Sequence, residues 1–299
     1  MQLIMKKNIM MLLTAVLALS ACYKEAALDR EVHDPAFTIE DSSEPGKHAI
    51  YELYKNFGIA TFYEYNDVDY KWNMNSYSNY NATRIDPAFL EPAMNYLEDV
   101  FFGLYDNSFK KSYMPFKIYL ASELTSESSD ETTDVYATSV RSGMIVGRLR
   151  EDALPKTPEE YKAAAGELSA SLWANYLVQN ERLSIPDEFY DVSKDYYGVN
   201  SLSSAVDLQD YMTEGFLDYD HTNSLNNGTT YLFLPKAEMD IYQYVQKITT
   251  TSSEEMQAFC KKYDKIRIKY NILVNAVKSA TGVDLQAIGD KVAAKYPTE

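Results

Sequence analysis

Cysteine and histidine are scarce in this chain of 299 residues, which has two cysteines and three histidines. Cys22 lies close to the N-terminus, so only Cys260 is left for a folded domain, and neither an intramolecular disulfide nor a C-x-x-C site can form. The histidines are His33, His48 and His221. No two of them have the four-residue spacing with which one helix face holds a metal ion. The sequence therefore excludes a zinc site built on a helical histidine pair.

Positive charge is also in short supply, with 28 Lys and Arg against 44 Asp and Glu and a net charge of -16. Phosphate backbones repel so acidic a chain, so nucleic acid is not an expected partner. The chain contains no G-x-S-x-G elbow, no G-x-G-x-x-G loop and no P-loop. The sequence does not exclude a glycoside hydrolase with two paired carboxylates, because its many acidic residues offer too many candidate pairs.

Long apolar runs are absent as well, although the N-terminus has a short one. Lys6 and Lys7 precede apolar residues that extend to Leu19. This run is shorter than the roughly 20 apolar residues that a membrane-spanning helix needs. A cationic start followed by a short apolar run predicts a secretory signal over residues 1–21.

The end of this signal has a recognisable cleavage motif. Leu19-Ser20-Ala21-Cys22 resembles the bacterial lipobox, which implies that Cys22 is acylated and anchors the protein to the outer membrane. The charged residues after Cys22 resemble a surface-export signal of Bacteroidota lipoproteins, but they equally suit a solvated tether, so surface and periplasmic locations both stay open. Residues 22–46 have the polarity of a flexible tether that spans roughly 25 to 30 Å, and residues 47–299 are expected to form one domain.

The residue periodicity predicts an α+β fold with strands early and helices late. We expect strands within 59–65, 116–120 and 135–149, and an early helix that ends at Gly58. Residues 218–228 are predicted to be a polar, turn-rich segment. Further helices are expected at 86–105, 157–179, 185–192, 208–216, 238–248 and 252–282, with a last one capped by Asp284.

Two helix starts have strong local signals. Thr157-Pro158-Glu159-Glu160 and the segment from Ser252 to Glu255 both match a capping box, in which the first and last side chains bond each other's backbone N–H groups. The helix after Thr157 has two apolar stripes. Little of its circumference can therefore face water, and we expect it to be central.

Several segments in a fixed order resemble a family of zinc metallopeptidases found among Bacteroidota surface lipoproteins. They are IATFYEY at 59–65, the capped central helix, DEFYDVSKDYYG at 187–198, GFLDYD at 215–220 and the C-terminal run EEMQAF followed by VDLQAIGDKV. The resemblance covers most of the chain beyond the tether. It implies a zincin-like metallopeptidase frame, with a small mixed sheet, flanking helices and a mainly helical C-terminal half.

The family's central helix carries H-E-x-x-H, in which two histidines hold zinc and the glutamate activates water. Aligned with that motif are Gly166, Glu167 and Ala170, so the resemblance implies that the glutamate is kept and both histidines are lost. A third ligand, from an acidic helix, aligns with Gln243, while Asp240 keeps a family carboxylate. We therefore expect a vestigial site without zinc or any other cofactor.

Simpler roles for the same residues follow from helix physics. Glutamate in a helix more often faces solvent or pairs with lysine or arginine than acts in catalysis. Glycine costs roughly 1 kcal/mol in a helix interior, so Gly166, together with Ala170, is expected to let a neighbouring segment pack closely.

We expect Cys260 to be an inert thiol. A calcium site is possible in principle in the polar loop, but its spacing favours an ordinary turn; the candidates are Asp218, Asp220, Asn223, Asn226 and Asn227.

The function predicted from these observations is binding rather than catalysis. The chain has 26 tyrosines, with clusters at 51–80 and 190–197, and tyrosine surfaces suit peptides or sugars. We expect an inactive metallopeptidase-like lipoprotein that binds peptide or glycan, beside an outer-membrane uptake complex. Two alternatives stay open: an active metal-dependent hydrolase with unrecognised ligands, and a structural component of the uptake assembly.

Overall fold

The computed structural model describes residues 37–71, 80–127, 132–140, 143–201, 208–226 and 228–298. The chain divides into Met1–Thr38 and a compact unit, Ile39–Glu299, to which the following description applies. The predicted signal, Cys22, His33 and most of the predicted tether lie outside the described residues, so these features stay predictions. The compact unit includes the last residues assigned to the tether, since its first helix begins at Pro45.

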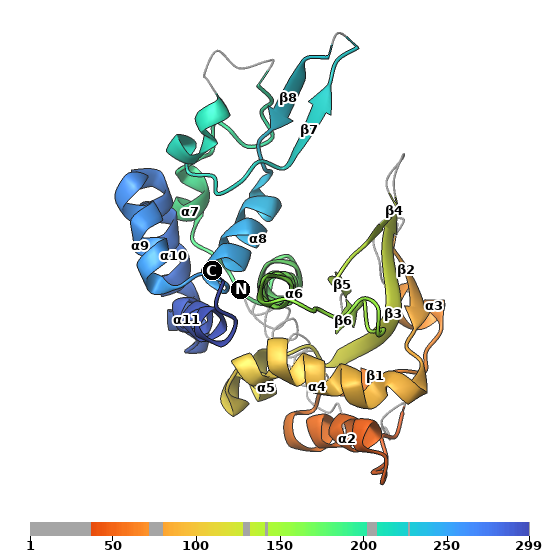
Figure 1. The fold of residues 1–299 in the computed structure, drawn as a ribbon. Helices are drawn as coiled ribbons and strands as arrows, with labels where there is room; N and C mark the ends of the chain where they lie inside the picture. Colours follow the sequence, from red (N-terminus) through yellow and green to blue (C-terminus); the bar gives the residue numbers. More distant parts are fainter. Residues whose placement is uncertain are drawn as a thin grey trace, which may run out of the picture. The chain divides into compact units, whose positions relative to one another are not determined.

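A small mixed sheet forms in the first half of this unit (Figure 1). Its central path runs in the order β1-β3-β6-β5, with β1 and β6 parallel to β3 and β5 antiparallel to β6. β2 and β4 pair antiparallel with the far part of β3. The strands are β1 (Ala60–Phe62), β2 (Tyr80–Arg84), β3 (Lys117–Glu127), β4 (Thr132–Asp134), β5 (Ala137–Val140) and β6 (Gly143–Val146).

The central strand β3 is buried on both faces. Ile118 and Leu120 belong to the main hydrophobic core, while Tyr119 and Ala121 point to a second cluster on the opposite face. Burial on both sides explains why this strand is rich in apolar residues at successive positions. The predicted strands at 59–65, 116–120 and 135–149 are confirmed, and the α+β class with a small mixed sheet is confirmed with them.

The helices before and beside the sheet differ in part from the prediction. α2 ends as expected at Gly58, which adopts a left-handed φ of 74°. The predicted helix at 86–105 is wrong as a continuous element, because the backbone at Phe101 leaves the helical region (φ -137°) and its side chain turns into the core. The elements are α2 (Pro45–Phe57), α3 (Asp67–Lys71), η1 (Pro87–Phe89), α4 (Leu90–Val100), η2 (Phe102–Leu104) and α5 (Asn107–Tyr113).

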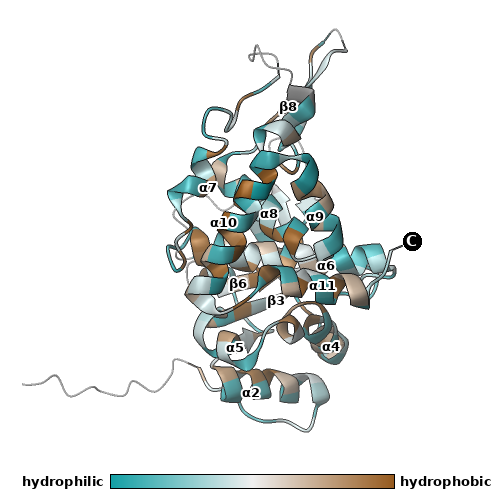
Figure 2. Ribbon diagram, turned by 90° about the vertical axis from the view of Figure 1, so that its left-hand side faces the viewer, coloured by the Kyte–Doolittle hydropathy of each residue, from teal (hydrophilic) through white to brown (hydrophobic). Residues whose placement is uncertain are grey.

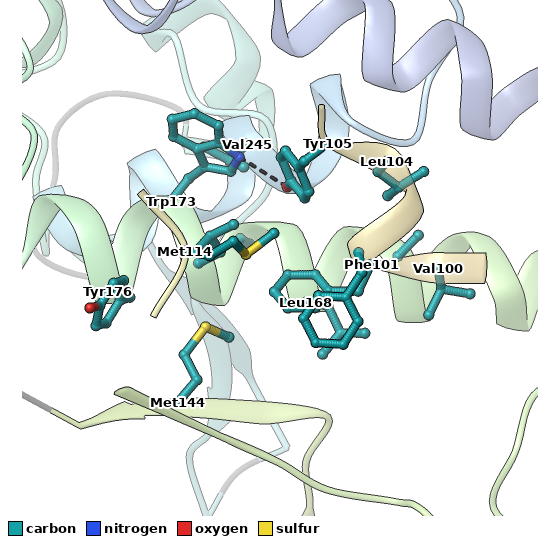
Figure 3. Packing of buried hydrophobic residues seen from close by; sticks show 14 of the residues in the cluster. Val100, Phe101, Leu104, Tyr105, Met114, Met144, Leu168, Trp173, Tyr176 and Val245 are labelled. Atoms are coloured by element: carbon teal, nitrogen blue, oxygen red, sulfur yellow. Dashed lines mark hydrogen bonds between the residues drawn. The ribbon is translucent and has the colours of Figure 1, made fainter. Parts of the chain in front are cut away.

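The predicted central helix is confirmed in two parts. α6 (Pro158–Ala170) starts at the expected capping box, and it continues as a π-helix, η3 (Ser171–Val178). Figure 3 shows Leu168 and Trp173 of this helix among buried side chains of other elements, where the Trp173 Nε1 donates to the Tyr105 hydroxyl at 3.1 Å. Apolar packing on several sides explains why so little of the helix faces water.

The C-terminal half is mainly helical, as predicted, with three corrections. The predicted helix at 208–216 is a 3₁₀ helix that ends at Glu214 and is interrupted at Asp210, whose φ of -104° and ψ of 56° are not helical. The expected helix at 252–282 breaks at Tyr263, whose φ of -129° and ψ of 106° are extended. The polar segment 218–228 contains a strand, β7 (His221–Ser224), which pairs with β8 (Thr230–Phe233) in a hairpin. The other elements are α7 (Asp187–Asp191), η4 (Leu208–Glu214), α8 (Ala237–Ile248), α9 (Ser253–Lys262), α10 (Asp264–Thr281) and α11 (Leu285–Lys295).

Hydrophobic and hydrophilic residues alternate along these helices instead of forming continuous apolar stretches (Figure 2). In the part of the chain that the structure describes, no helix combines the length and the apolar character needed to cross a membrane. The apolar faces of the helices instead pack inward, so that residues of α4, α6, α8, α10 and α11 share one core.

Candidate functional site

A large cleft of about 2030 Å³ is lined by β5, α6, α8 and the connecting segments 179–182 and 217–220. Its lining is acidic, since carboxylates outnumber cationic side chains. The acidic residues are Glu159, Glu167, Glu181, Asp218, Asp220, Glu238 and Glu255, and the basic ones are Lys162, Arg182, Lys236 and Lys247. The cleft therefore favours ligands that are neutral or positively charged.

Glu167 lies on the α6 side of this cleft, where two residues of α8 hold its carboxylate. The Tyr242 hydroxyl donates a short hydrogen bond to Oε2, and the Gln246 Nε2 donates to Oε1 at 2.8 Å. Burial and the neighbouring carboxylate raise the pKa of Tyr242, so its hydroxyl keeps the proton that it donates. The partners of Glu167 are thus a phenol and an amide, not the lysine or arginine that helix statistics suggested.

At Gly166, α6 packs closely against α8 and the turn that follows it. A Cβ atom added there would lie 2.7 Å from Thr250 Cγ2 and 3.0 Å from Gln246 Cγ. The expectation that glycine at this position permits close packing is therefore confirmed. Ala170, one turn later, is fully buried.

Zinc does not fit the residues that align with the family's ligands. Gly166 has no donor atom and faces Thr250 and Gln246, and the methyl group of Ala170 cannot coordinate a metal. Gln243 is an amide whose Nε2 donates to the Tyr219 carbonyl at 3.2 Å. Among the described residues, no group of three or more His, Cys, Asp and Glu side chains could hold a metal ion.

Asp240 does not line the cleft but is fully buried behind it. Its Oδ2 accepts from Lys269 Nζ at 2.6 Å and from the Tyr197 hydroxyl at 2.7 Å, and Lys269 also donates to the Gly215 carbonyl at 3.2 Å. Burial raises the pKa of Asp240 and lowers that of Lys269, while their mutual attraction opposes both changes. Asp240 therefore belongs to an internal ion pair, whereas Gln243 and Glu167 both line the cleft.

The other long wall of the cleft is β5, the edge strand of the sheet's central path. The Gly147 N–H donates to the Tyr136 carbonyl, which places that carbonyl on the β6 side. Because antiparallel pairing alternates along a strand, the backbone groups of Ala137 and Ser139 point to the other side. There the Ser171 hydroxyl donates to the Ala137 carbonyl at 3.5 Å. No described strand pairs with this side of β5.

The tyrosines of the 51–80 cluster divide between core and surface. Tyr65 and Tyr70 are buried against Tyr119, with exposures of 5%, 1% and 1%. Their rings are consequently not available as a binding platform, whereas Tyr80 lines the cleft and Tyr77 lies outside the described residues. In the 190–197 cluster, Tyr197 bonds Asp240 as described above.

The remaining sequence candidates have ordinary structural roles. Cys260 is a free, buried thiol whose pKa is raised by burial, as expected of an unreactive cysteine. In the polar loop, Asp218 and Asn223 accept hydrogen bonds from the next residue's backbone N–H, and Asp220 contacts His221. These side chains satisfy local turn and hairpin contacts.

Comparisons with known proteins give one structural likeness. No family model matches the chain, and no curated protein matches it. A solved structure with a similar fold is described as a "putative zinc-binding metallo-peptidase" from Bacteroides caccae; it is 18% identical, and the alignment covers 87% of this chain and 95% of that chain with a TM-score of 0.49. Similarity at this level does not transfer residue roles or an activity.

Proposed function

We propose that this protein is an envelope lipoprotein that binds an extended peptide segment in the cleft and does not hydrolyse it by zinc chemistry. The observation that carries the proposal is the open side of β5. On that side the Ala137 carbonyl accepts from Ser171, whereas no described strand pairs with the Ala137 N–H or with the N–H and C=O of Ser139. Such backbone groups along a cleft are complementary to another extended backbone, which can add to the sheet as a further strand. A glycan has no such regular array of donors and acceptors, so the geometry favours peptide.

The cleft dimensions and chemistry support the same occupant. Its volume of about 2030 Å³ exceeds the range of roughly 300–1,000 Å³ found for small-molecule pockets. The glutamate that would activate a zinc-bound water is instead held by Tyr242 and Gln246. The lipid anchor at Cys22 and a role beside an uptake complex belong to the proposal on the strength of the sequence alone.

The test uses blocked seven-residue peptides of alternating valine and threonine that differ only in the central residue, measured by calorimetry. Ser139→Pro removes one N–H from the open side of β5 and leaves Thr138 and Val140 to pair with β6. We expect this variant to have about tenfold lower affinity for each peptide that binds, because backbone hydrogen bonds are lost. The bound peptide should be recovered uncleaved in mass spectra.

Ser139→Ala is the matched control, since it removes the side-chain hydroxyl but keeps the N–H. We expect its affinity to stay within about threefold of the unmodified protein, a difference of less than 1 kcal/mol. Circular dichroism checks that both variants fold. Equal binding by the proline and alanine variants, or no binding of any peptide, would overturn the proposed function.

A further inference from the structure

The Glu167 carboxylate has no cationic hydrogen-bond partner among the described residues. Its two hydrogen-bond donors, Tyr242 and Gln246, are uncharged. No described lysine, arginine or histidine forms a salt bridge with it, although fourteen such pairs occur elsewhere in the described residues. A half-buried carboxylate held only by neutral groups gains most from a ligand that brings the missing positive charge.

The carboxylate also keeps room for a further donor. A carboxylate accepts about four hydrogen bonds, and a side-chain donor occupies one acceptor position on each oxygen of Glu167. Gln243 of α8 also lines the cleft, and its Oε1 is buried without a hydrogen-bond partner among the described residues. Glu167 thus keeps spare acceptor positions in the cleft, which points to a ligand group with several N–H donors.

The surroundings suit a cation in two further ways. Tyr242 lies against Glu167, and tyrosine rings attract ammonium and guanidinium groups. The cleft lining has more carboxylates than cations, so its field favours a positively charged group before contact. Side chains of a strand added to β5 would alternate in direction, and one set would point toward α6 and α8, where Glu167 lies.

We infer that Glu167 is the recognition group for a lysine or arginine side chain of the bound peptide. This inference rests on the proposed function, because it assigns specificity to a peptide that lies along β5. A glutamate that would be catalytic in a zinc peptidase is here a specificity-determining contact: its oxygens accept hydrogen bonds from the ligand cation while Tyr242 and Gln246 fix its orientation.

The first test compares the blocked peptides with central lysine, arginine, methionine or glutamate on the unmodified protein. We expect the lysine and arginine peptides to bind about tenfold more tightly than the methionine peptide, and the glutamate peptide to bind most weakly. The preference for lysine should shrink as salt is added, because screening weakens the attraction. Equal affinities for the lysine and methionine peptides would overturn the inference.

The second test replaces Glu167 with glutamine, which removes the charge and keeps an acceptor for Tyr242. We expect Glu167→Gln to reduce the lysine preference to threefold or less, with little change for the methionine peptide. The control is Glu159→Gln, an identical charge change on the same helix and cleft, which should keep the preference. If both variants lose the lysine preference equally, the preference arises from the overall negative charge of the cleft, and the role of Glu167 is overturned.

The two proposals fail in different ways. If the lysine and methionine peptides bind equally and Ser139→Pro weakens both, the cleft binds peptide along β5 and the inference about Glu167 is wrong. If no peptide binds, the proposed function is wrong and the inference falls with it.

Discussion

At residue 166 a single hydrogen atom determines how closely α6 can approach α8. Glycine is a poor helix residue, and alanine would ordinarily stabilise the helix by about 1 kcal/mol. Here the added methyl group would lie 2.7 Å from Thr250 Cγ2. The Thr250 hydroxyl donates to the Gln246 carbonyl at 2.8 Å, so the methyl group of Thr250 cannot turn away freely.

We therefore predict that Gly166→Ala destabilises the protein by about 1 kcal/mol net, because overpacking costs about 1–3 kcal/mol and outweighs the gain in helix propensity. Urea unfolding followed by circular dichroism measures the change. Thr250→Ser removes the clashing methyl group and should recover most of the loss in the double variant. An alanine variant as stable as the unmodified protein would show that Thr250 and Gln246 do not constrain this position.

Glu167 could be predicted from the sequence as a residue of the candidate site, but its contacts could not. Alignment with a known motif selected it and Gly166 from the sequence. Its partners could not be selected in the same way, because Tyr242 and Gln246 lie 75 and 79 residues further along the chain. Their own i, i+4 spacing is common to countless helices. The contact depends on the packing of α6 against α8, which no local pattern encodes.

Among the elements, α8 and α10 are joined by the buried pair Asp240 and Lys269. Both side chains are 0% exposed. The Lys269 ammonium lies within 5.5 Å of the ring centres of four aromatic residues, Phe189, Tyr197, Phe216 and Tyr244. The pair is thus enclosed by side chains from α7, α8 and the segments that precede and follow η4.

We predict that Lys269→Met destabilises the fold by about 3–5 kcal/mol at pH 7, because it leaves a buried carboxylate without a counter-charge. Without Lys269, burial keeps the folded-state pKa of Asp240 above its unfolded value. Stability is then fully present below the unfolded pKa and is lost as pH rises through the folded pKa, so the variant should lose less stability near pH 4.

The double variant Asp240→Asn, Lys269→Met removes both charges and serves as the control. We expect it to recover more than half of the loss in urea unfolding at pH 7. If the Lys269→Met variant unfolds at the same urea concentration as the unmodified protein, the role of this pair in joining α8 to α10 is contradicted.

Elements with local start signals could be predicted from the sequence, and elements without them could not. The capping boxes at Thr157 and Ser252 correctly located α6 and α9, because a cap depends on residues three positions apart. The strand β7 is exposed at every position and so lacks the apolar alternation by which strands are recognised. Good helix formers flank the break at Tyr263, so the spacing of apolar residues predicted one continuous helix across it.

At the scale of the whole molecule, strand order decides the function that we propose. The sequence indicated strands in 135–149 but not which of them lies at an edge of the sheet, since the order β1-β3-β6-β5 arises from pairing across long stretches of chain. The net charge of -16 was evident from the start. The excess of carboxylates over cationic side chains in the lining of the cleft beside the edge strand emerges only from the fold.

Amide hydrogen exchange at Ser139, followed by NMR, tests the central claim most directly. The Ser139 N–H points away from β6, so it should exchange rapidly in the free protein. Saturating lysine peptide should slow its exchange by about tenfold or more as the peptide pairs with β5, while the N–H groups of α11 keep their rates. Binding of the peptide with unchanged exchange at Ser139 would contradict the account.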